Sequence, residues 1–137
     1  LVLKDDAVVD EVVAALRPGL AADAVVVDHT TTQPRLTAER AGRLAREGVR
    51  YLHCPVFIGP AAARQGKGTI LAAGPQPLFA EVEPALARMA ERVRYLGERP
   101  DRAAAVKLCG NAYIIGFSAL VADVLAVARG GGVSAED

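Results

Sequence analysis

The stretch DAVVVDHTTTQPRLTAERAGRLAREGVRYLHC, residues 23–54, decides the fold. Residues 23–30 form a continuous apolar run of strand length with polar side chains at the carboxyl end. Residues 33–48 predict an amphipathic helix, apolar on one side and rich in arginine and glutamate on the other. Residues 49–57 are strand-like again. This order and spacing predict a βαβ unit with parallel strands.

The same alternation extends in both directions from this unit. Residues 1–3 are strand-like and residues 6–16 predict a short helix. Strands at 68–74 and 92–97 flank a helix at 76–90. That helix places four apolar residues on one face: Phe79, Val82, Leu86 and Met89. We therefore expect an α/β fold with a largely parallel sheet.

The last helix is predicted from residues 103–128, AAAVKLCGNAYIIGFSALVADVLAVA, with Asp101 as its N-cap. At about 40 Å it is too long to cover one edge of a small sheet, so we expect it to begin a helical domain. Residues 112–128 approach the roughly 20 apolar residues of a membrane span. Asp123 near the middle would be costly in lipid, which favours a buried core helix.

Bulk composition narrows the functional classes. The 137 residues suffice for one domain or parts of two, and 16 basic residues balance 16 acidic ones. This balance gives no sign of a nucleic-acid or membrane partner. The two cysteines have no CxxC spacing, which favours a reduced, cytoplasmic setting. The chain opens on an apolar run and closes on Ser134, a good cap for another helix, so we expect a segment of a longer protein.

Two predicted strands end in polar residues, where α/β sheets bind ligands. Thr30, Thr31 and Thr32 follow the first of these strands, and helix capping and ligand contact stay open alternatives for them. At the next strand end His53 is a candidate base, although a structural role is favoured. We expect no metal site, because the candidate ligands match no common zinc spacing. Those candidates are His29, His53, Cys54 and Cys109.

The glycine-rich segment GPAAARQGKGT, residues 59–69, resembles a phosphate loop only superficially. Gly59 and Gly66 are too far apart, and Lys67 is followed by glycine rather than serine or threonine. We interpret the segment as an exposed, basic turn between strands. A GxGxxG fingerprint is absent from the sequence.

A lysine and an asparagine interrupt the apolar start of the last helix. Lys107 and Asn111 are four residues apart, about 400° of helical rotation, so they point to nearly the same side. A cation is disfavoured near a helix N-terminus, and beside apolar surface the pKa of Lys107 should be lowered. That suits a group that gives and takes a proton. The alternative, a lysine that snorkels to solvent, leaves Asn111 unexplained.

Together these motifs resemble the β-hydroxyacid dehydrogenase family, which includes 3-hydroxyisobutyrate dehydrogenases and is related to 6-phosphogluconate dehydrogenase and the imine reductases. VVVDHTTTQP, residues 25–34, resembles the family's D-x-[ST]-T-x-x-P strand end. Residues 48–74 resemble its substrate-loop region, and KLCGN, residues 107–111, matches its K-x-x-x-N catalytic signature. The resemblance runs in order over essentially the whole chain.

The resemblance implies the C-terminal part of an NAD(P)-binding Rossmann-type domain at residues 1–100, followed at 101–137 by a long interdomain helix that begins an all-α domain. It implies a dehydrogenase or reductase that acts on CH–OH donors with NAD or NADP, NADP being favoured. The expected substrate is a small carbonyl or hydroxy compound, and the expected assembly is a homodimer through the helical domain. Without the glycine fingerprint, we expect the chain alone to bind a dinucleotide weakly.

The family's residue roles transfer where the motifs match. By resemblance, Lys107 is the general acid/base, and Asn111 holds the substrate and orients the lysine. The implied cofactor contacts are Leu3, Lys4, Thr31 and Gly97.

The chain departs from the family at the substrate loop. Phe57, Ile58 and Gly59 stand where most members have Ser-Gly-Gly to bind the substrate carboxylate, and His53 replaces the usual aspartate. The loop gains apolar bulk, which favours a larger or less polar carbonyl or an imine over small hydroxy acids. Retention of Lys107 favours carbonyl chemistry. The alternatives are NADPH-dependent imine reduction and a non-catalytic, dimerising member that binds a dinucleotide.

Overall fold

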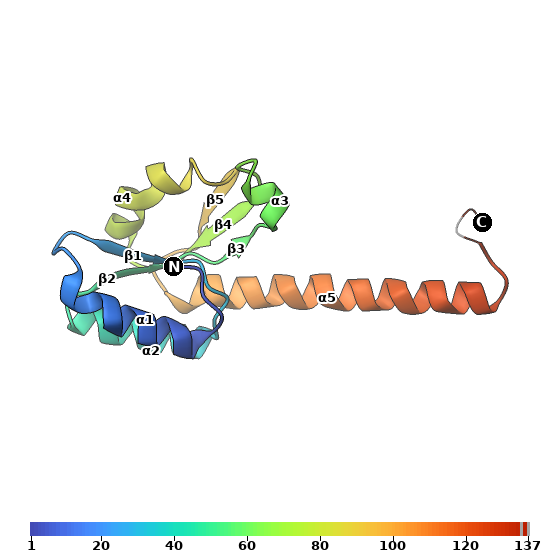
Figure 1. Ribbon diagram of the computed structural model, residues 1–137, viewed down its shortest axis with the longest axis horizontal. Helices are drawn as coiled ribbons and strands as arrows, with labels where there is room; N and C mark the ends of the chain where they lie inside the picture. Colours follow the sequence, from blue (N-terminus) through green and yellow to red (C-terminus); the bar gives the residue numbers. More distant parts are fainter. Residues whose placement is uncertain (135, 137) are drawn as a thin grey trace. The chain divides into compact units, whose positions relative to one another are not determined.

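The computed structural model describes residues 1–134 and 136 of the chain. They form two compact units, Leu1–Lys107 and Leu108–Asp137. The first is an α/β unit with helices on both faces of its strands (Figure 1), which confirms the predicted fold class. The long last helix starts within this first unit, so the domain boundary at residue 100 stays a prediction.

The predicted βαβ unit consists of β1 (Val25–Asp28), α2 (Pro34–Arg46) and β2 (Arg50–His53). The two strands pair in parallel, with Asp28 opposite His53 at their carboxyl ends. Pro34 suits the first turn of α2 because its φ is already helical and its missing N–H would have no helical partner.

Residues 1–3 lie beside β1 without forming a regular strand. The N-terminal nitrogen of Leu1 donates to the Val27 carbonyl at 2.6 Å, and the His29 amide donates to the Leu1 carbonyl at 2.9 Å. This extended segment therefore ends next to the polar residues that follow β1.

A second sheet contains β3 (Val56–Phe57), β4 (Thr69–Ala72) and β5 (Arg92–Tyr95). β4 and β5 are parallel and connected through α4 (Gln76–Leu86), whereas β3 is antiparallel to β4. A short helix, α3 (Pro60–Ala63), lies in the connection that the sequence predicts as a plain turn.

The strand predicted over residues 49–57 is broken into β2 and β3 at Cys54 and Pro55. Proline has no N–H to donate to a strand ladder, so the pairing changes at this point. Just before the break, His53 forms a bridge with Ala73, whose amide donates to the His53 carbonyl at 3.1 Å. This bridge joins the two sheets.

The two larger apolar clusters of the α/β unit pack against different helices. The first lies against α4 and includes Leu52, Cys54, Ile70, Ala72, Leu78, Phe79, Leu86 and Ala90. The second lies against α1 (Asp6–Leu16) and α2 and includes Val9, Val13, Val26, Leu44 and Tyr51. Met89, which the sequence places on the buried face of α4, is 51% exposed because the helix ends before it.

Arg40 of α2 is 1% exposed, whereas the sequence pattern places the arginines of this helix in solvent. Its Nη2 lies 2.7 Å from Asp6 Oδ1, and its Nε lies 2.7 Å from Asp10 Oδ1. Both carboxylates belong to α1, whose bounds are as predicted. The arginine is buried because its charge is paired where the two helices meet.

The long helix α5 (Asp101–Gly130) contains the predicted residues 103–128, and Asp101 is its first residue rather than its N-cap. The expectation of a buried core helix at 112–128 is wrong, because residues 112–127 are exposed and no other described segment of the second unit packs on them. By length and composition alone, α5 is long and apolar enough to cross a membrane. One such helix is only weak evidence for a membrane span, because core helices of soluble proteins pass the same test. The helix start predicted after Ser134 involves residues 135 and 137, which lie outside the described residues.

Candidate active site

The polar residues after β1 and β2 are brought together at one end of the parallel pair. The Cys54 amide donates to the Asp28 carbonyl at 2.7 Å, which continues the ladder one residue beyond the strands. Asp28 is fully buried, and its carboxylate accepts the Thr30 amide at 3.0 Å and the Tyr51 hydroxyl at 2.6 Å. Burial, together with Asp28, raises the pKa of Tyr51 above its ordinary value.

Two of the three threonines after β1 are structural. Thr30 Oγ1 accepts the Leu3 amide at 3.0 Å, and Thr32 Oγ1 lies 2.7 Å from Thr37 Oγ1; both threonines are buried. The capping alternative is wrong for all three, because the N-cap residue of α2 is Gln33, without a side-chain cap. Thr31 is exposed between its buried neighbours, so its ligand contact stays a prediction.

His53 is fully buried beneath this turn. Its Nε2 lies 3.0 Å from the Thr30 carbonyl and 3.0 Å from Thr32 Oγ1. Because a carbonyl can only accept, Nε2 carries the proton and donates to Thr30. Burial lowers the pKa of His53, although the bond to Thr30 opposes this. A buried, neutral histidine that holds a turn fits the structural role favoured from the sequence.

Of the other candidate metal ligands, His29 and Cys54 are hydrogen-bonded neighbours, whereas Cys109 is exposed on α5. His29 Nδ1 donates to the Cys54 carbonyl at 2.6 Å, and burial lowers the pKa of this histidine. Cys54 is buried, which raises the pKa of its thiol to about 12. Within residues 1–134 and 136, no three His, Cys, Asp or Glu residues cluster closely enough to hold a metal ion.

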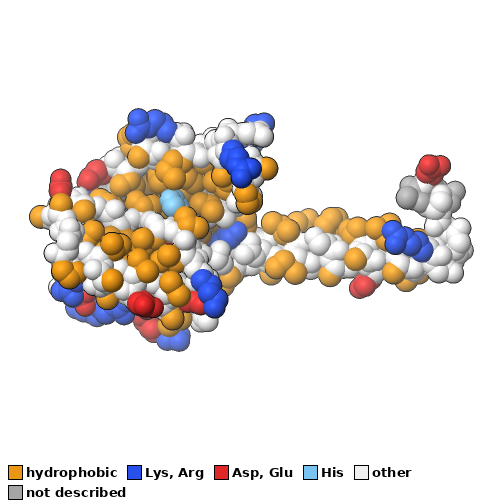
Figure 2. All heavy atoms as spheres, viewed as in Figure 1, with side chains coloured by type: hydrophobic (Ala, Val, Ile, Leu, Met, Phe, Trp, Pro, Cys, Tyr) orange, Lys and Arg blue, Asp and Glu red, His pale blue; other side chains and the backbone are white. Residues whose placement is uncertain are grey.

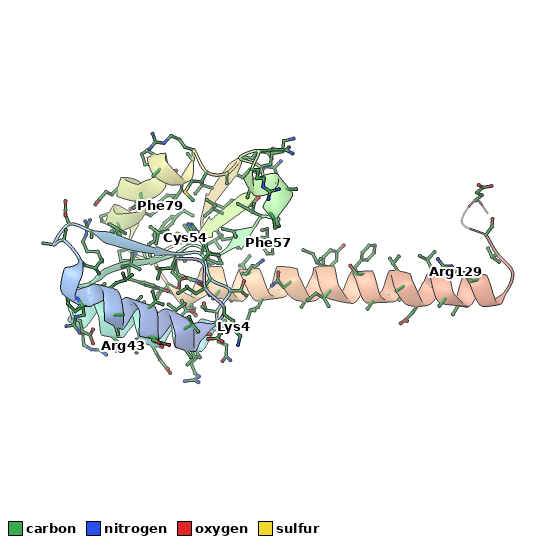
Figure 3. All side chains as sticks on the ribbon, in the orientation of Figure 1. Lys4, Arg43, Cys54, Phe57, Phe79 and Arg129 are labelled. Carbon is green, nitrogen blue, oxygen red and sulfur yellow. The ribbon has the colours of Figure 1, made fainter. Side chains whose placement is uncertain are left out.

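Lys107 lies at the end of the first unit and is 9% exposed. Its Nζ lies 4.2 Å from the centroid of the Phe57 ring, the side chain of β3 marked in Figure 3. Burial lowers the pKa of Lys107, in the direction expected from the sequence. The structure therefore joins a catalytic candidate to a substrate-loop candidate 50 positions earlier in the chain. Asn111 is half-buried on the same helix, in the second unit.

Ile58 and Gly59 lie apart from the Lys107 contact and line a different hollow. This hollow has a volume of about 590 Å³, and Figure 2 shows it surrounded by hydrophobic side chains with a histidine visible inside. Its lining consists of Val2, His29, Val56, Ile58, Gly59, Pro60, Ala63, Arg64, Gly66, Ile70, Arg88 and Met89. Ile58 also packs against Gly68, where a Cβ would lie only 2.6 Å from Ile58 Cγ1.

Three of the predicted cofactor residues lie close together, whereas the fourth, Gly97, lies in the other sheet region. Leu3 is bonded through its amide to Thr30, so Leu3, Lys4 and Thr31 lie on adjoining segments, with Lys4 and Thr31 exposed. Gly97 follows β5 in the other sheet, with φ at +103° and its carbonyl accepting the Gly74 amide at 3.1 Å. Sequence reasoning did not identify Asp28, Tyr51 and Thr37 as buried partners of this site. The acidic residue at the end of the VVVD strand was the one sequence feature that pointed to them.

Comparison with known proteins places this arrangement in a family. Residues 1–97 match the family described as the NAD binding domain of 6-phosphogluconate dehydrogenase. The NADH-dependent oxidoreductase ucdB of Aspergillus ustus is 29% identical over 133 residues, 97% of this chain and 44% of that protein. Mitochondrial 3-hydroxyisobutyrate dehydrogenase of Homo sapiens is 31% identical over 87 residues, 64% of this chain and 26% of that protein.

Solved structures share the fold over nearly the whole chain. The 3-hydroxyisobutyrate dehydrogenase ygbJ of Salmonella typhimurium has a TM-score of 0.87 at 23% identity, covering 96% of this chain and 47% of that one. An imine reductase variant from Myxococcus stipitatus, in complex with NAD+, has a TM-score of 0.85 at 22% identity, covering 98% and 46%. The chain thus spans less than half the length of these proteins. With the family match extending over most of its residues, the chain belongs to the β-hydroxyacid dehydrogenase family, in the part that corresponds to the 6-phosphogluconate dehydrogenase type of NAD-binding domain.

Proposed function

We propose that this chain is part of an NAD(P)-dependent oxidoreductase that transfers a hydride between a nicotinamide and a carbonyl or alcohol carbon, with CH–OH compounds as donors. The observation that carries the proposal is the enclosed Lys107, whose pKa is lowered by burial at the position of the family's K-x-x-x-N signature. An ammonium group with a lowered pKa gives up its proton more readily at neutral pH.

The chain's own residues would handle the proton. In the reduction direction the Lys107 ammonium donates a proton to the substrate oxygen, and in oxidation the neutral amine takes it back. Asn111, four residues along the same helix, lies on nearly the same face and would hold the substrate and orient the lysine. The bound nicotinamide supplies or accepts the hydride.

The residues at the carboxyl end of β1 fit a nucleotide cofactor. Lys4 and Thr31 are exposed on adjoining segments at a strand end, which is where α/β sheets bind such ligands. We assign the cofactor as NAD or NADP, with NADP favoured, and Leu3 and Gly97 as its further contacts.

The proposed substrate is a small carbonyl or hydroxy compound with a larger or less polar body than the common hydroxy acids. Phe57 supports this, because its ring lies against Lys107 at the position where the family resemblance implies a serine that binds the substrate carboxylate. The proposed assembly is a homodimer through the helical part, supported by the exposed apolar side chains of α5. We also propose a cytoplasmic location, with no membrane or nucleic-acid partner.

Replacing Lys107 by Ala tests the assignment. In the intact protein we expect kcat to fall by about 10²- to 10⁴-fold, the usual contribution of a general acid/base. Cofactor affinity should change little, because the proposed cofactor contacts lie on other segments. The exposed Lys67 provides the control, and K67A should keep normal turnover. Near-normal turnover of K107A, measured by NAD(P)H absorbance, would contradict the proposal.

Imine reduction is the second candidate, supported by the apolar Phe57 and by the fold shared with imine reductases. Assays with matched panels of ketones and cyclic imines separate the two reactions, and the proposal expects turnover of the ketones. A third candidate, a non-catalytic dimerising member, predicts cofactor binding without turnover of either panel.

A further inference from the structure

The aromatic ring of Phe57 lies beside the ammonium group of Lys107. The distance of 4.2 Å from Nζ to the Phe57 centroid lies well within the roughly 6 Å range of cation–π attraction. Within residues 1–134 and 136, no hydrogen bond or ion pair to Nζ is formed. The ring face is therefore the electrostatic partner that the described chain offers to this ammonium group.

The rest of the surroundings are apolar. At the start of α5, Ala103 forms a small buried cluster with Leu71 and Ala73, and Phe57 and Leu96 pack against it. Burial lowers the pKa of Lys107, and within residues 1–134 and 136 no charged side chain forms an ion pair with it. Two opposing effects thus act on the ammonium: burial disfavours the charge, and the negative face of the ring favours it.

We propose that Phe57 is a positioning residue for Lys107, whose ring face holds the ammonium group in place and keeps it protonated until a substrate oxygen accepts the proton. This inference rests on the proposed role of Lys107 as the proton donor. The ring attracts the charged donor but has no such attraction for the neutral amine left after transfer. It therefore stabilises the form that starts the reduction.

The contact between Phe57 and Lys107 also favours some substrates over others. A carboxylate near Nζ would have to lie against the ring and forgo the hydroxyl that a serine at position 57 would provide. An uncharged ketone or aldehyde with an apolar group next to its carbonyl can pack that group on the ring while its oxygen reaches Nζ. Phe57 is thus expected to select against small hydroxy acids.

NMR of the full chain tests the contact independently of activity. The sequence contains three lysines, Lys4, Lys67 and Lys107, so 13C-labelled lysine gives few side-chain signals, and K107R identifies the one of interest. If the ring lies over the ammonium, the ε-protons of Lys107 should be shifted upfield relative to those of Lys4 and Lys67. The absence of this ring-current shift in the unmodified chain would overturn the proposal.

Two substitutions then separate the ring's charge effect from its bulk. F57L keeps an apolar side chain but removes the π face, so the pKa of Lys107 should fall by about half to one pH unit. F57Y keeps the face and should leave the titration nearly unchanged. Equal titration of Lys107 in F57L and F57Y would overturn the proposal, and the signals of Lys4 and Lys67 serve as internal controls. Should F57L fail to fold, the ring-current shift of the unmodified chain and of F57Y decides the question.

Kinetics of the intact protein complete the test. In the reduction direction, where Lys107 must be protonated, F57L should move the basic limb of the plot of kcat against pH to lower pH, whereas F57Y should not. Full turnover by K107A would refute the proposed function, whereas the NMR measurement on the unmodified chain would still show whether the ring lies over Lys107, so the two failures are distinguishable.

Discussion

His53 has one ring nitrogen that is bonded and one that is not. Nε2 holds the turn after β1 through the Thr30 carbonyl, whereas Nδ1 is buried and has no hydrogen-bond partner among the described residues. Protonation would place a second N–H and a positive charge in this enclosed site. The unpaired nitrogen therefore makes the turn that carries Thr31 sensitive to acid.

We expect the free energy of unfolding to decrease as the pH falls below about 6.5. Burial lowers the pKa of His53 in the folded chain, so the unfolded chain takes up the proton first. The half-buried His29 acts in the same direction, and above this range neither group contributes a slope. Urea unfolding followed by circular dichroism between pH 8 and pH 5 measures the effect. H53Q should be less pH-dependent than the unmodified chain, and an identical slope would contradict the assignment.

At the scale of the elements, the contact between α1 and α2 combines apolar packing with a buried charge. Arg40 bonds both Asp6 and Asp10, whereas the neighbouring Arg43 bonds Asp10 from an exposed position. Burial opposes the charge of Arg40, but the hydrogen bonds of the two carboxylates outweigh this and raise its pKa. The two arginines form a matched pair for measuring what enclosure adds.

R40M should destabilise the chain by about 3 kcal/mol, because it leaves two carboxylates at the helix contact without their enclosed partner. R43M removes an exposed contact to Asp10 and should cost less than about 1 kcal/mol. Denaturant unfolding at pH 7 gives both values. Equal destabilisation by the two substitutions would show that the burial of Arg40 adds nothing.

The sequence predicts the elements better than their contacts. The periodicity of residues 6–16 gives α1 its observed bounds, because hydrophobic spacing and capping are local properties. The apolar pattern of residues 49–57 predicts one strand, whereas Pro55 divides this segment into β2 and β3. The burial of Arg40 and the approach of Phe57 to Lys107 depend on segments 30 or more positions apart, and the sequence pattern carries no information on such pairs.

At the scale of the whole molecule, the main feature is the uncovered apolar surface of α5. Its exposed large side chains include Tyr113, Ile114, Ile115, Phe117, Leu120, Val121, Val124, Leu125 and Val127. Soluble chains rarely leave so continuous an apolar surface in water, and such surfaces mark contacts with a partner. This supports the proposed dimer.

We expect the full chain to self-associate and the double variant L120E/V124E to weaken the dimer at least about tenfold. Two carboxylates on the apolar surface would lose hydration in a dimer without gaining partners. Sedimentation equilibrium measures the change, and R129E, which alters charge without removing apolar surface, is the control. A monomeric unmodified chain at high micromolar concentration would contradict the proposed assembly.

The two cysteines should differ in their reactivity towards electrophiles and oxidants, because one is exposed and the other is buried. Cys109 is exposed on α5, two positions after Lys107, whereas Cys54 is enclosed where β2 leads into β3. Reagents in solution therefore reach the sulfur at position 109 directly. The thiol of Cys54, with its pKa raised to about 12, reacts only when the α/β unit opens. The rate at which Cys54 is alkylated therefore measures how often the strand ends near the candidate cofactor site open, and no added probe is needed.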